Sequence, residues 1–261
     1  MVALVACYGA ICLLMFCLQG RLLYVTSVPP AWSPAQYGLS FEDWMLTTED
    51  GITINAWYLP ARQARGVLIV CHGNAGNIGY EIPFARMFVD RGWSCVLLEY
   101  RGYGRSGGSP SEQGTYLDAV AAFDAARKAA PELPIAVFGS SLGGAIAIEL
   151  ALRRKVAAVI TEATFTSLPK LAQEMYRWLP VRWLTRFRYD SLSKMGRLTV
   201  PYLNIHSPGD RLVPYRHSAP LLAACRSRKE HLRTEGGHND GGFQQNPEWV
   251  DAVVRFLEGA G

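Results

Sequence analysis

The sequence has few charged residues, no lysine-rich run and no cysteine pair at the spacing of metal ligands. Charged residues make up 18% of the chain, the net charge is only +4 and the arginines are scattered, so we expect no nucleic-acid partner. Three of the six cysteines lie in an apolar N-terminal run and two in strand-like apolar runs, which argues against a structural zinc site and a secreted disulfide framework. We expect no metal or organic cofactor.

The longest stretch without charge is the N-terminal run. Residues 1–18 are uncharged and mostly apolar, which is nearly enough for a helix to cross a bilayer. A cleaved signal peptide is an alternative, but no basic segment and no small-residue cleavage site come before Arg21. A buried core helix is a third interpretation, which the lack of a polar face disfavours. We therefore predict an uncleaved, single-pass membrane anchor over residues 1–25.

The segment after the anchor, residues 26–38, is rich in proline; we expect its prolines to prevent helix and its length to suit a tether. Arg21, Arg62 and Arg65 follow the apolar run and no charged side chain precedes it, which favours a domain on the cytoplasmic side. A signal anchor would instead place the domain outside. The side of the membrane therefore stays open.

Two apolar patterns follow the tether. Residues 41–47 and 52–59 alternate around Glu49-Asp50-Gly51, which predicts an antiparallel hairpin. Short continuous apolar runs typical of buried strands then alternate with helical stretches: runs at 67–71, 94–100, 135–138, 156–161 and 202–206, helices at 79–91, 112–130 and 142–154, and a last strand at 232–234 before a helix at 246–257. We predict one α/β domain over residues 39–261, with a mostly parallel central sheet and helices on both faces.

One long connection, residues 165–199, interrupts this alternation, and we call it the lid segment. It carries aromatic residues and several arginines, among them Trp178, Trp183 and Arg186. Long insertions above the carboxyl ends of parallel strands often act as lids or binding walls. The alternative is a helix pair that only packs over the core with its arginines directed outward. A further hypothesis is that this surface rests on an anionic bilayer.

A serine in a glycine frame is the strongest chemical signal in the chain. Residues 139–143 read Gly-Ser-Ser-Leu-Gly between a strand-like run and an alanine-rich run, so Ser141 falls on a sharp strand-to-helix turn. Only very small residues two positions before and after such a serine avoid collision, and its hydroxyl then projects away from the sheet. The pattern also arises by chance in glycine-rich chains, but its context predicts that Ser141 is a nucleophile.

Ser141 needs a neighbouring base, and the chain has five histidines. His238 lies in a glycine-flanked loop after the last predicted strand, where the base falls in the chain order serine, acid, histidine. We therefore predict His238 as the base. The other four histidines are expected in structural or solvated positions: His72 and His206 at the ends of core strands, and His217 and His231 in exposed polar contexts.

The base needs a carboxylate to orient it and to stabilise the imidazolium. Asp210 follows the strand predicted at 202–206 and so lies at the same edge of the sheet. Asp240 is nearer to His238 in sequence, but two residues along one loop it cannot easily reach the far ring nitrogen. Asp190 is better explained as a helix cap before Ser191. We predict Asp210 as the acid.

The tetrahedral intermediate of an acyl transfer needs two donors for its oxyanion. The backbone N–H of Leu142 begins the helix after Ser141 and supplies the first, with help from the helix dipole. We assign the second to the backbone N–H of Asn74, with Ala75 as second choice, in the glycine-containing loop His-Gly-Asn-Ala-Gly-Asn at 72–77. A phosphate-binding loop is the alternative, but the Gly-Lys-Ser/Thr ending is absent.

The chain resembles α/β-hydrolases of the BEM46 type and is similar to the ABHD13 and ABHD17 branches of serine hydrolases. The matching segments are HGNAGN at 72–77, YRGYGRSGGSPSEQG at 100–114, FGSSLGGAIAIELA at 138–151, ATFTS at 163–167, HSPGDRLVP at 206–214 and GGHND at 236–240. The resemblance implies an α/β-hydrolase fold in which Ser141, Asp210 and His238 are nucleophile, acid and base. The family often has Arg at position 140 and Gly at 207, so the serines there are expected to alter pocket polarity.

Arg101 and Arg105 lie in the glycine-rich segment 100–114. They could hold a substrate carboxylate or phosphate, but arginines in such turns more often tie loops together through backbone carbonyls. We favour the structural role.

These observations predict a membrane-tethered serine hydrolase that cleaves an ester or thioester through an acyl-Ser141 intermediate, with esterase chemistry (EC 3.1) preferred to peptidase chemistry (EC 3.4). The resemblance implies a small-molecule or lipid-acyl substrate. A serine peptidase or amidase of the same fold is one alternative, and a non-catalytic membrane adaptor is another. The natural substrate, its acyl-chain length and the oligomeric state stay open.

Overall fold

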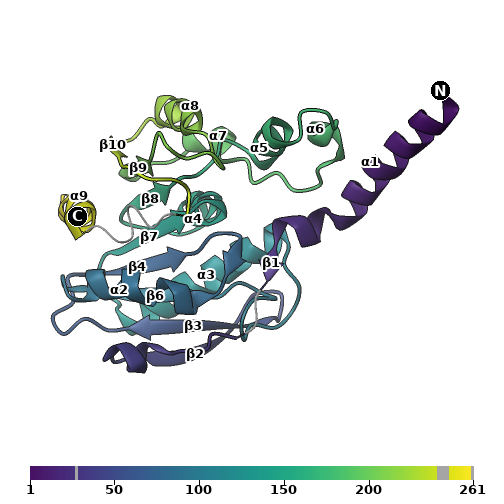
Figure 1. The fold of residues 1–261 in the computed structure, drawn as a ribbon. Coiled ribbons are helices and arrows are strands. Elements are labelled where there is room, and N and C mark those ends of the chain that lie inside the picture. The colour runs from purple at the N-terminus through teal and green to yellow at the C-terminus, as the bar shows by residue number, and fades with distance from the viewer. Residues whose placement is uncertain (27–28, 240–246, 260–261) are drawn as a thin grey trace.

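The computed structural model describes residues 1–26, 29–239 and 247–259 (Figure 1). Its centre is an eight-stranded sheet in the order β10-β9-β8-β7-β4-β6-β3-β2, in which β3 runs antiparallel to both neighbours and the other pairings are parallel. The strands are β2 Glu42–Thr47, β3 Thr53–Leu59, β4 Gly66–Cys71, β6 Trp93–Leu98, β7 Ile135–Ser140, β8 Val159–Glu162, β9 Tyr202–His206 and β10 Lys229–Arg233. The predicted hairpin and mostly parallel sheet are confirmed.

The last strand begins earlier than the sequence suggests. We expected residues 232–234, whereas β10 spans Lys229–Arg233 and pairs with β9 over its whole length. Most side chains of this edge strand are exposed. An edge strand with exposed polar residues has no continuous apolar run that would reveal it in the sequence.

Helices cover both faces of the sheet, as predicted, and each face has its own core. Helices α3 (Glu112–Ala129) and α4 (Leu142–Arg153) lie on one face, and α2 (Ile82–Val89) and α9 (Pro247–Glu258) on the other. Neighbouring residues of β4 alternate between the two cores, with Ile69 in the first and Val70 in the second. This alternation buries β4 on both sides, which explains its uninterrupted apolar sequence.

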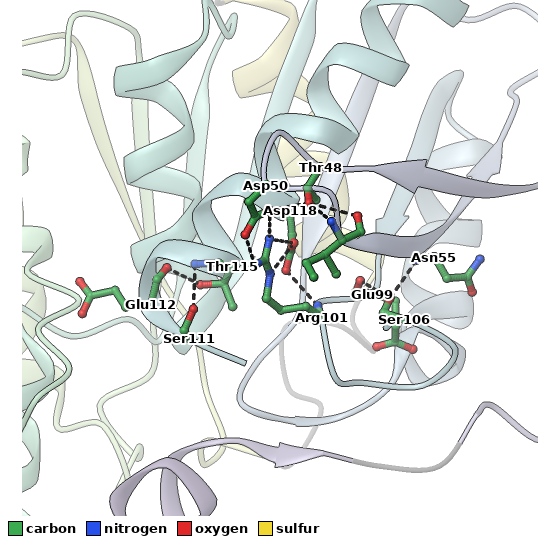
Figure 2. A network of polar contacts seen from close by, with 12 residues as sticks. Thr48, Asp50, Asn55, Glu99, Arg101, Ser106, Ser111, Glu112, Thr115 and Asp118 are labelled. Carbon is green, nitrogen blue, oxygen red and sulfur yellow. Dashed lines mark hydrogen bonds and ion pairs between the residues drawn. The ribbon is translucent and has the colours of Figure 1, made fainter. Parts of the chain in front are cut away.

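Arg101 is a structural residue beneath the hairpin (Figure 2). Its backbone N–H and its Nε donate to Asp118, each at 2.9 Å, and its Nη1 and Nη2 donate to Asp50 at 2.6 and 2.9 Å. The guanidinium is buried, and burial raises the pKa of Asp118 to about 6 although Arg101 opposes the shift. The structural role is the one we favoured, but the partners are carboxylates rather than backbone carbonyls.

The N-terminal segment is a long helix with a short bound strand at its end. Helix α1 (Val2–Leu23) projects away from the sheet (Figure 1), and β1 (Val25–Thr26) pairs in parallel with β5 (Ala75–Gly76). Within the predicted tether, Pro34–Tyr37 forms a 3-10 helix. Our expectation that proline prevents helix is wrong there, because Pro34 occupies a first-turn position, where its missing N–H has no cost.

The lid segment contains three short helices, which lie above the sheet edge in the view of Figure 1. They are α5 (Leu168–Met175), α6 (Val181–Leu184) and α7 (Ser191–Met195). The Asp190 side chain accepts a hydrogen bond from the Ser193 N–H at 3.1 Å, so the predicted cap of α7 is confirmed. A further short helix, α8 (Ser218–Ala224), follows β9.

Candidate active site

Ser141 occupies a strained turn between β7 and α4. Its φ is +52°, a conformation that residues with a side chain rarely adopt. The backbone N–H of Ser141 donates to the Glu162 carbonyl and the Thr164 hydroxyl donates to the Ser141 carbonyl, both at 2.8 Å. A Cβ on Gly139 would collide with the backbone of Gly143. Glycine is thus required at position 139 for the steric reason that the sequence suggested.

The structure brings Ser141, His238 and Asp210 together at the carboxyl edge of the sheet. His238 Nε2 lies 3.1 Å from Ser141 Oγ, and His238 Nδ1 lies 2.7 Å from Asp210 Oδ2. Ser141 follows β7, Asp210 follows β9 and His238 follows β10. Because the carboxyl ends of these parallel strands meet at one edge, residues 97 and 28 positions apart can form one hydrogen-bonded chain.

Asp210 is held as a carboxylate. Burial opposes its ionisation, but hydrogen bonds from His206 and His238 and the backbone N–H of Val213 outweigh burial and hold its pKa well below the usual range. Its Oδ1 accepts the N–H groups of Leu212 at 2.9 Å and Val213 at 2.8 Å. The competing residue Asp240 lies outside the described residues.

Two other histidines have structural partners, as expected. His206 lies 2.7 Å from the Ser218 hydroxyl through Nδ1 and 2.9 Å from the Val213 carbonyl through Nε2. His72 packs against the rings of Tyr100 and Tyr103, and its Nε2 lies 3.3 Å from a carboxylate oxygen of Glu99. Among the described residues, neither of these two histidines forms a hydrogen bond with the Ser141 hydroxyl, whereas His238 does.

The expectation for His217 is wrong, because its side chain is fully buried rather than solvated. Its Nδ1 accepts a hydrogen bond from the Thr166 N–H at 3.2 Å, and its Nε2 lies 3.2 Å from a carboxylate oxygen of Glu174. The latter residue belongs to α5 of the lid segment. The polar neighbours of His217 in the sequence concealed a partner that lies 43 residues away.

The two predicted oxyanion donors border the same space as Ser141. Asn74 and Leu142 line a cavity together with Ser141. The Asn74 carbonyl accepts hydrogen bonds from the Val25 N–H at 3.0 Å and the Tyr103 hydroxyl at 2.7 Å, which fixes the orientation of the peptide between Asn74 and Ala75. The donor roles of Leu142 and Asn74 stay predictions.

Two cavities of different character meet at Ser141. The apolar cavity, of about 190 Å³, extends under the lid segment and reaches α1, where Met15 and Leu22 form part of its wall. The polar cavity, of about 360 Å³, lies on the His238 side and is lined by carboxyl and hydroxyl groups, including Glu81 and Glu235. A substrate bond at Ser141 would therefore have an apolar group on one side and a polar group on the other.

Two contributions to this site were not recognised in the sequence. Residues of α1 line the apolar cavity. This contribution could not be predicted, because apolar residues surround the helix and no pattern marks the face that makes the contact. Ser207, noted only as a departure from the family, donates its hydroxyl to the Gly236 carbonyl and so joins the Asp210 loop to the His238 loop. With Ser140, it also lines the polar cavity, where we expected these serines to act.

Comparison with known proteins finds relatives over nearly the whole chain. Residues 66–200 match the family model of the alpha/beta hydrolase fold. The chain is 35% identical to Rv2307c, an uncharacterized protein of Mycobacterium tuberculosis, over 98% of this chain and 92% of that protein. It is 29% identical to Bem46 of Schizosaccharomyces pombe, over 85% and 80% of the two chains, and 31% identical to YNL320W, an uncharacterized membrane protein of Saccharomyces cerevisiae, over 92% and 88%.

A solved structure, the esterase Pf2001 of Pyrococcus furiosus, matches with a TM-score of 0.78 at 20% sequence identity. The match covers 91% of this chain and all of that one. At this identity the likeness concerns the fold. The fold class predicted from the sequence is thereby confirmed.

Proposed function

This chain belongs to the α/β-hydrolase fold family, and from that premise we propose that it is a serine hydrolase that cleaves an ester or thioester through an acyl-Ser141 intermediate. The observation that carries the proposal is the hydrogen-bonded chain from Ser141 Oγ through His238 to Asp210, with distances of 3.1 and 2.7 Å. A nucleophile, a base within reach of its proton and a carboxylate that orients the base are the parts that acyl transfer requires.

The first half of the reaction forms the acyl enzyme. Ser141 Oγ attacks the carbonyl carbon of the substrate while His238 Nε2 takes the hydroxyl proton. The negative charge that develops on the carbonyl oxygen is stabilised by the N–H groups of Leu142 and Asn74. The bond to the leaving oxygen or sulfur then breaks, and His238 returns the proton to that atom.

The second half releases the acid. A water molecule attacks the acyl carbonyl while His238 Nε2 takes its proton, and collapse of the second tetrahedral intermediate expels Ser141 Oγ, which recovers that proton. Asp210, held as a carboxylate by His206 and Val213, orients the imidazole and stabilises its charged form in both halves.

The two cavities support an assignment of the substrate's ends. The apolar cavity suits the acyl chain, because its walls are mostly apolar, and the polar cavity suits the alcohol or thiol that leaves. Helix α1 has 22 residues and a mean hydropathy of 2.2 in its most apolar window, and the relative YNL320W is described as a membrane protein. We therefore assign α1 as a single-pass membrane anchor.

Labelling with a fluorophosphonate probe tests the function. Such probes phosphonylate activated serines, so the full-length protein is expected to be labelled and Ser141→Ala is expected to be unlabelled. Ser140→Ala is the matched control, since Ser140 is the adjacent serine in the turn and should leave labelling in place. Absence of labelling in the native protein would favour the non-catalytic adaptor.

A panel of chromogenic substrates separates the hydrolase classes. Ester or thioester cleavage that is lost in Ser141→Ala is the expected result. Cleavage of the peptide substrates at a higher kcat/KM than the esters would overturn the assignment in favour of a peptidase or amidase.

A further inference from the structure

Helix α1 is bound to the body of the protein through its C-terminal half. The side-chain amide of Asn74 donates to the Leu23 carbonyl at 2.9 Å, and the Val25 N–H donates to the Asn74 carbonyl at 3.0 Å. Gln19 joins the same half of the helix to the lid segment. Its Oε1 accepts the Arg186 N–H at 2.7 Å, and its Nε2 donates to another lid carbonyl at 3.4 Å. The end of α1 is thus held between the lid segment and the Asn74 loop.

One face of the C-terminal half of α1 forms a wall of the apolar cavity. Met15, Gln19 and Leu22 line the cavity, and their spacing of three to four residues puts them on the same side of a helix. The same cavity is lined by Ser141 and Leu142. An acyl chain attached to Ser141 would therefore pass between the lid segment and α1.

The lid segment extends along α1 rather than ending at its base. The Tyr8 hydroxyl donates to the Trp178 carbonyl at 2.9 Å, and the Arg186 guanidinium lies 5.0 Å from the centre of the Phe16 ring. Tyr8 is about 22 Å along the helix axis from Leu23 at 1.5 Å per residue. The whole helix has 22 residues, about the length needed to cross a hydrocarbon core. When α1 is inserted in a bilayer, the part of the lid segment from Trp178 to Arg186 therefore lies in the lipid layer beside it.

The exposed side chains of this part suit the boundary of a bilayer. Trp178 is 61% exposed and Trp183 is 79% exposed, and the Arg182 guanidinium lies 5.3 Å from the centre of the Trp183 ring. Tryptophan is enriched at the level of lipid headgroups, and arginine side chains reach from apolar surroundings toward phosphates. Exposure of two such large apolar rings to water costs free energy, and contact with lipid would remove that cost.

We propose that α1 and the lid segment enter the bilayer together and form a side entrance, through which an acyl chain reaches Ser141 directly from the lipid layer. The inference rests on the proposed function and adds the route of its substrate, an ester or thioester whose acyl chain enters the apolar cavity from the membrane. The cavity volume of about 190 Å³ is small beside the roughly 300–1,000 Å³ of sites that enclose whole ligands. A long chain therefore leaves its distal part between α1 and the lid segment, in contact with lipid.

The acyl chain can come from a membrane lipid or from a lipidated protein, which present the same chemistry to this entrance. The two sources differ in the group that enters the polar cavity, an alcohol from an ester or a cysteine thiol from a thioester. The experiment therefore uses a diacyl phosphatidylglycerol and an S-palmitoyl cysteine peptide, each embedded in phosphatidylcholine vesicles.

The test compares two neighbouring positions of α1 in the full-length protein reconstituted in these vesicles. Met15→Trp fills the cavity wall, and Leu14→Trp is the matched control, because Leu14 is 57% exposed and is not part of the cavity wall. Cleavage of each long-chain substrate is measured relative to cleavage of a soluble acetyl ester. Met15→Trp is expected to lower the ratio of long-chain to acetyl kcat/KM by about tenfold or more, and Leu14→Trp to leave it unchanged.

An equal ratio in Met15→Trp and the native protein would overturn the side entrance, and so would an equal fall in both variants. A fall with only one of the two long-chain substrates identifies the source of the acyl chain. Failure of the proposed function looks different, because the native protein would then cleave neither the acetyl ester nor the long-chain substrates and would not react with a fluorophosphonate.

A second measurement tests the immersion without any catalysis. Vesicles containing brominated acyl chains quench the fluorescence of tryptophans that lie in the hydrocarbon region. Quenching of Ser141→Ala is expected to fall strongly when Trp178 and Trp183 are both replaced by phenylalanine. Quenching that is unchanged by this double replacement would show that the lid segment lies outside the lipid, and would overturn the proposal whether or not the protein is a hydrolase.

Discussion

The two cavities that meet at Ser141 are built in different ways. The polar one is lined by the carboxyl ends of the central strands β7, β8 and β9, by the loops that follow them and by residues near the Asn74 loop. The apolar one takes part of its wall from α1, which lies outside the sheet and its covering helices. Under the proposed function the two cavities have different tasks. The groups for bond cleavage come from the fold itself, whereas binding of the acyl chain depends on a helix that the fold does not require.

The two cavities should therefore respond differently to substitution. Changes on the polar side are expected to affect every substrate alike, since all substrates use Ser141, His238 and Asp210. Changes on the apolar side are expected to affect long acyl chains more than short ones. The ratio of long-chain to acetyl kcat/KM distinguishes the two kinds of effect.

The largest effect is expected from Asp210→Asn on the polar side. The substitution removes the charge that orients His238 and stabilises its imidazolium, so kcat/KM should fall by about 10⁴-fold for long and short esters alike. The rate of ester hydrolysis at substrate concentrations well below KM measures kcat/KM. Asp190→Asn is the control, because Asp190 caps α7 at the surface of the lid segment and asparagine also caps helices. A loss confined to long-chain esters would contradict the assignment of Asp210.

Gln19→Leu should act on the apolar side. It removes both hydrogen bonds that Gln19 makes with the lid segment while keeping the size of the side chain. Loss of such contacts is expected to lower kcat/KM for a long-chain ester by about tenfold, with a smaller change for an acetyl ester. A steady-state comparison of the two esters checks this, and equal losses with both would show that Gln19 supports the fold rather than the cavity.

Ser207→Ala should have a smaller effect that is uniform among substrates. The hydroxyl joins the loop of Asp210 to the loop of His238 through the Gly236 carbonyl, and one such bond contributes about 1 kcal/mol to the free energy of unfolding. Denaturant unfolding measures the loss, and kcat/KM should fall less than tenfold for every ester. A change in the long-chain to acetyl ratio would contradict the separation of the two cavities.

The smallest effect is expected from His217→Gln, as a change in pH dependence. Burial, the largest influence, lowers the pKa of His217, partly offset by Glu174 and reinforced by the positive charges of Lys170 and Arg216. When the pH falls below about 6.5, the ordinary histidine pKa, His217 therefore binds a proton in the unfolded chain more readily than in the folded chain. The free energy of unfolding falls as the pH drops through that region. The separate loss from Glu174, whose pKa is also lowered, begins only in more acid solution.

Thermal unfolding on both sides of this pH checks the prediction. The native protein should lose more Tm on acidification than His217→Gln, because glutamine carries no proton-binding group into the buried position. An equal loss in the two proteins would mean that the buried His217 does not contribute to the pH dependence of stability.

The sequence predicted the parts whose neighbours in the chain determine them. Strands such as β4 are buried on both faces and show as apolar runs, and the turn at Ser141 shows in its glycines because a Cβ at position 139 or 143 would meet backbone. The placement of Ser141, Asp210 and His238 after strands of the sheet followed from the alternation of strands and helices, and the chain order serine, acid, histidine was used to choose among the candidates. These features depend on local sterics and on one repeated topology.

The features that escaped the sequence depend on distant partners. The buried His217 has its partner Glu174 in the lid segment. Tyr24, placed in the predicted anchor, is buried in the core with its hydroxyl 2.8 Å from that of Tyr189. The pairing of β1 with β5 involves two residues on each side. None of these leaves a periodic pattern in a single sequence.

The attachment of Gln19 to lid residues 165 and 167 positions later has a consequence for the order of synthesis. A ribosome adds about 5–20 residues per second, so α1 emerges roughly ten to thirty seconds before its partners. With α1 acting as the anchor, the helix is already embedded while the rest of the chain is being made. The wall of the apolar cavity that α1 and the lid segment share is then assembled at the membrane surface. Completion of the proposed site therefore depends on insertion of α1 into the membrane.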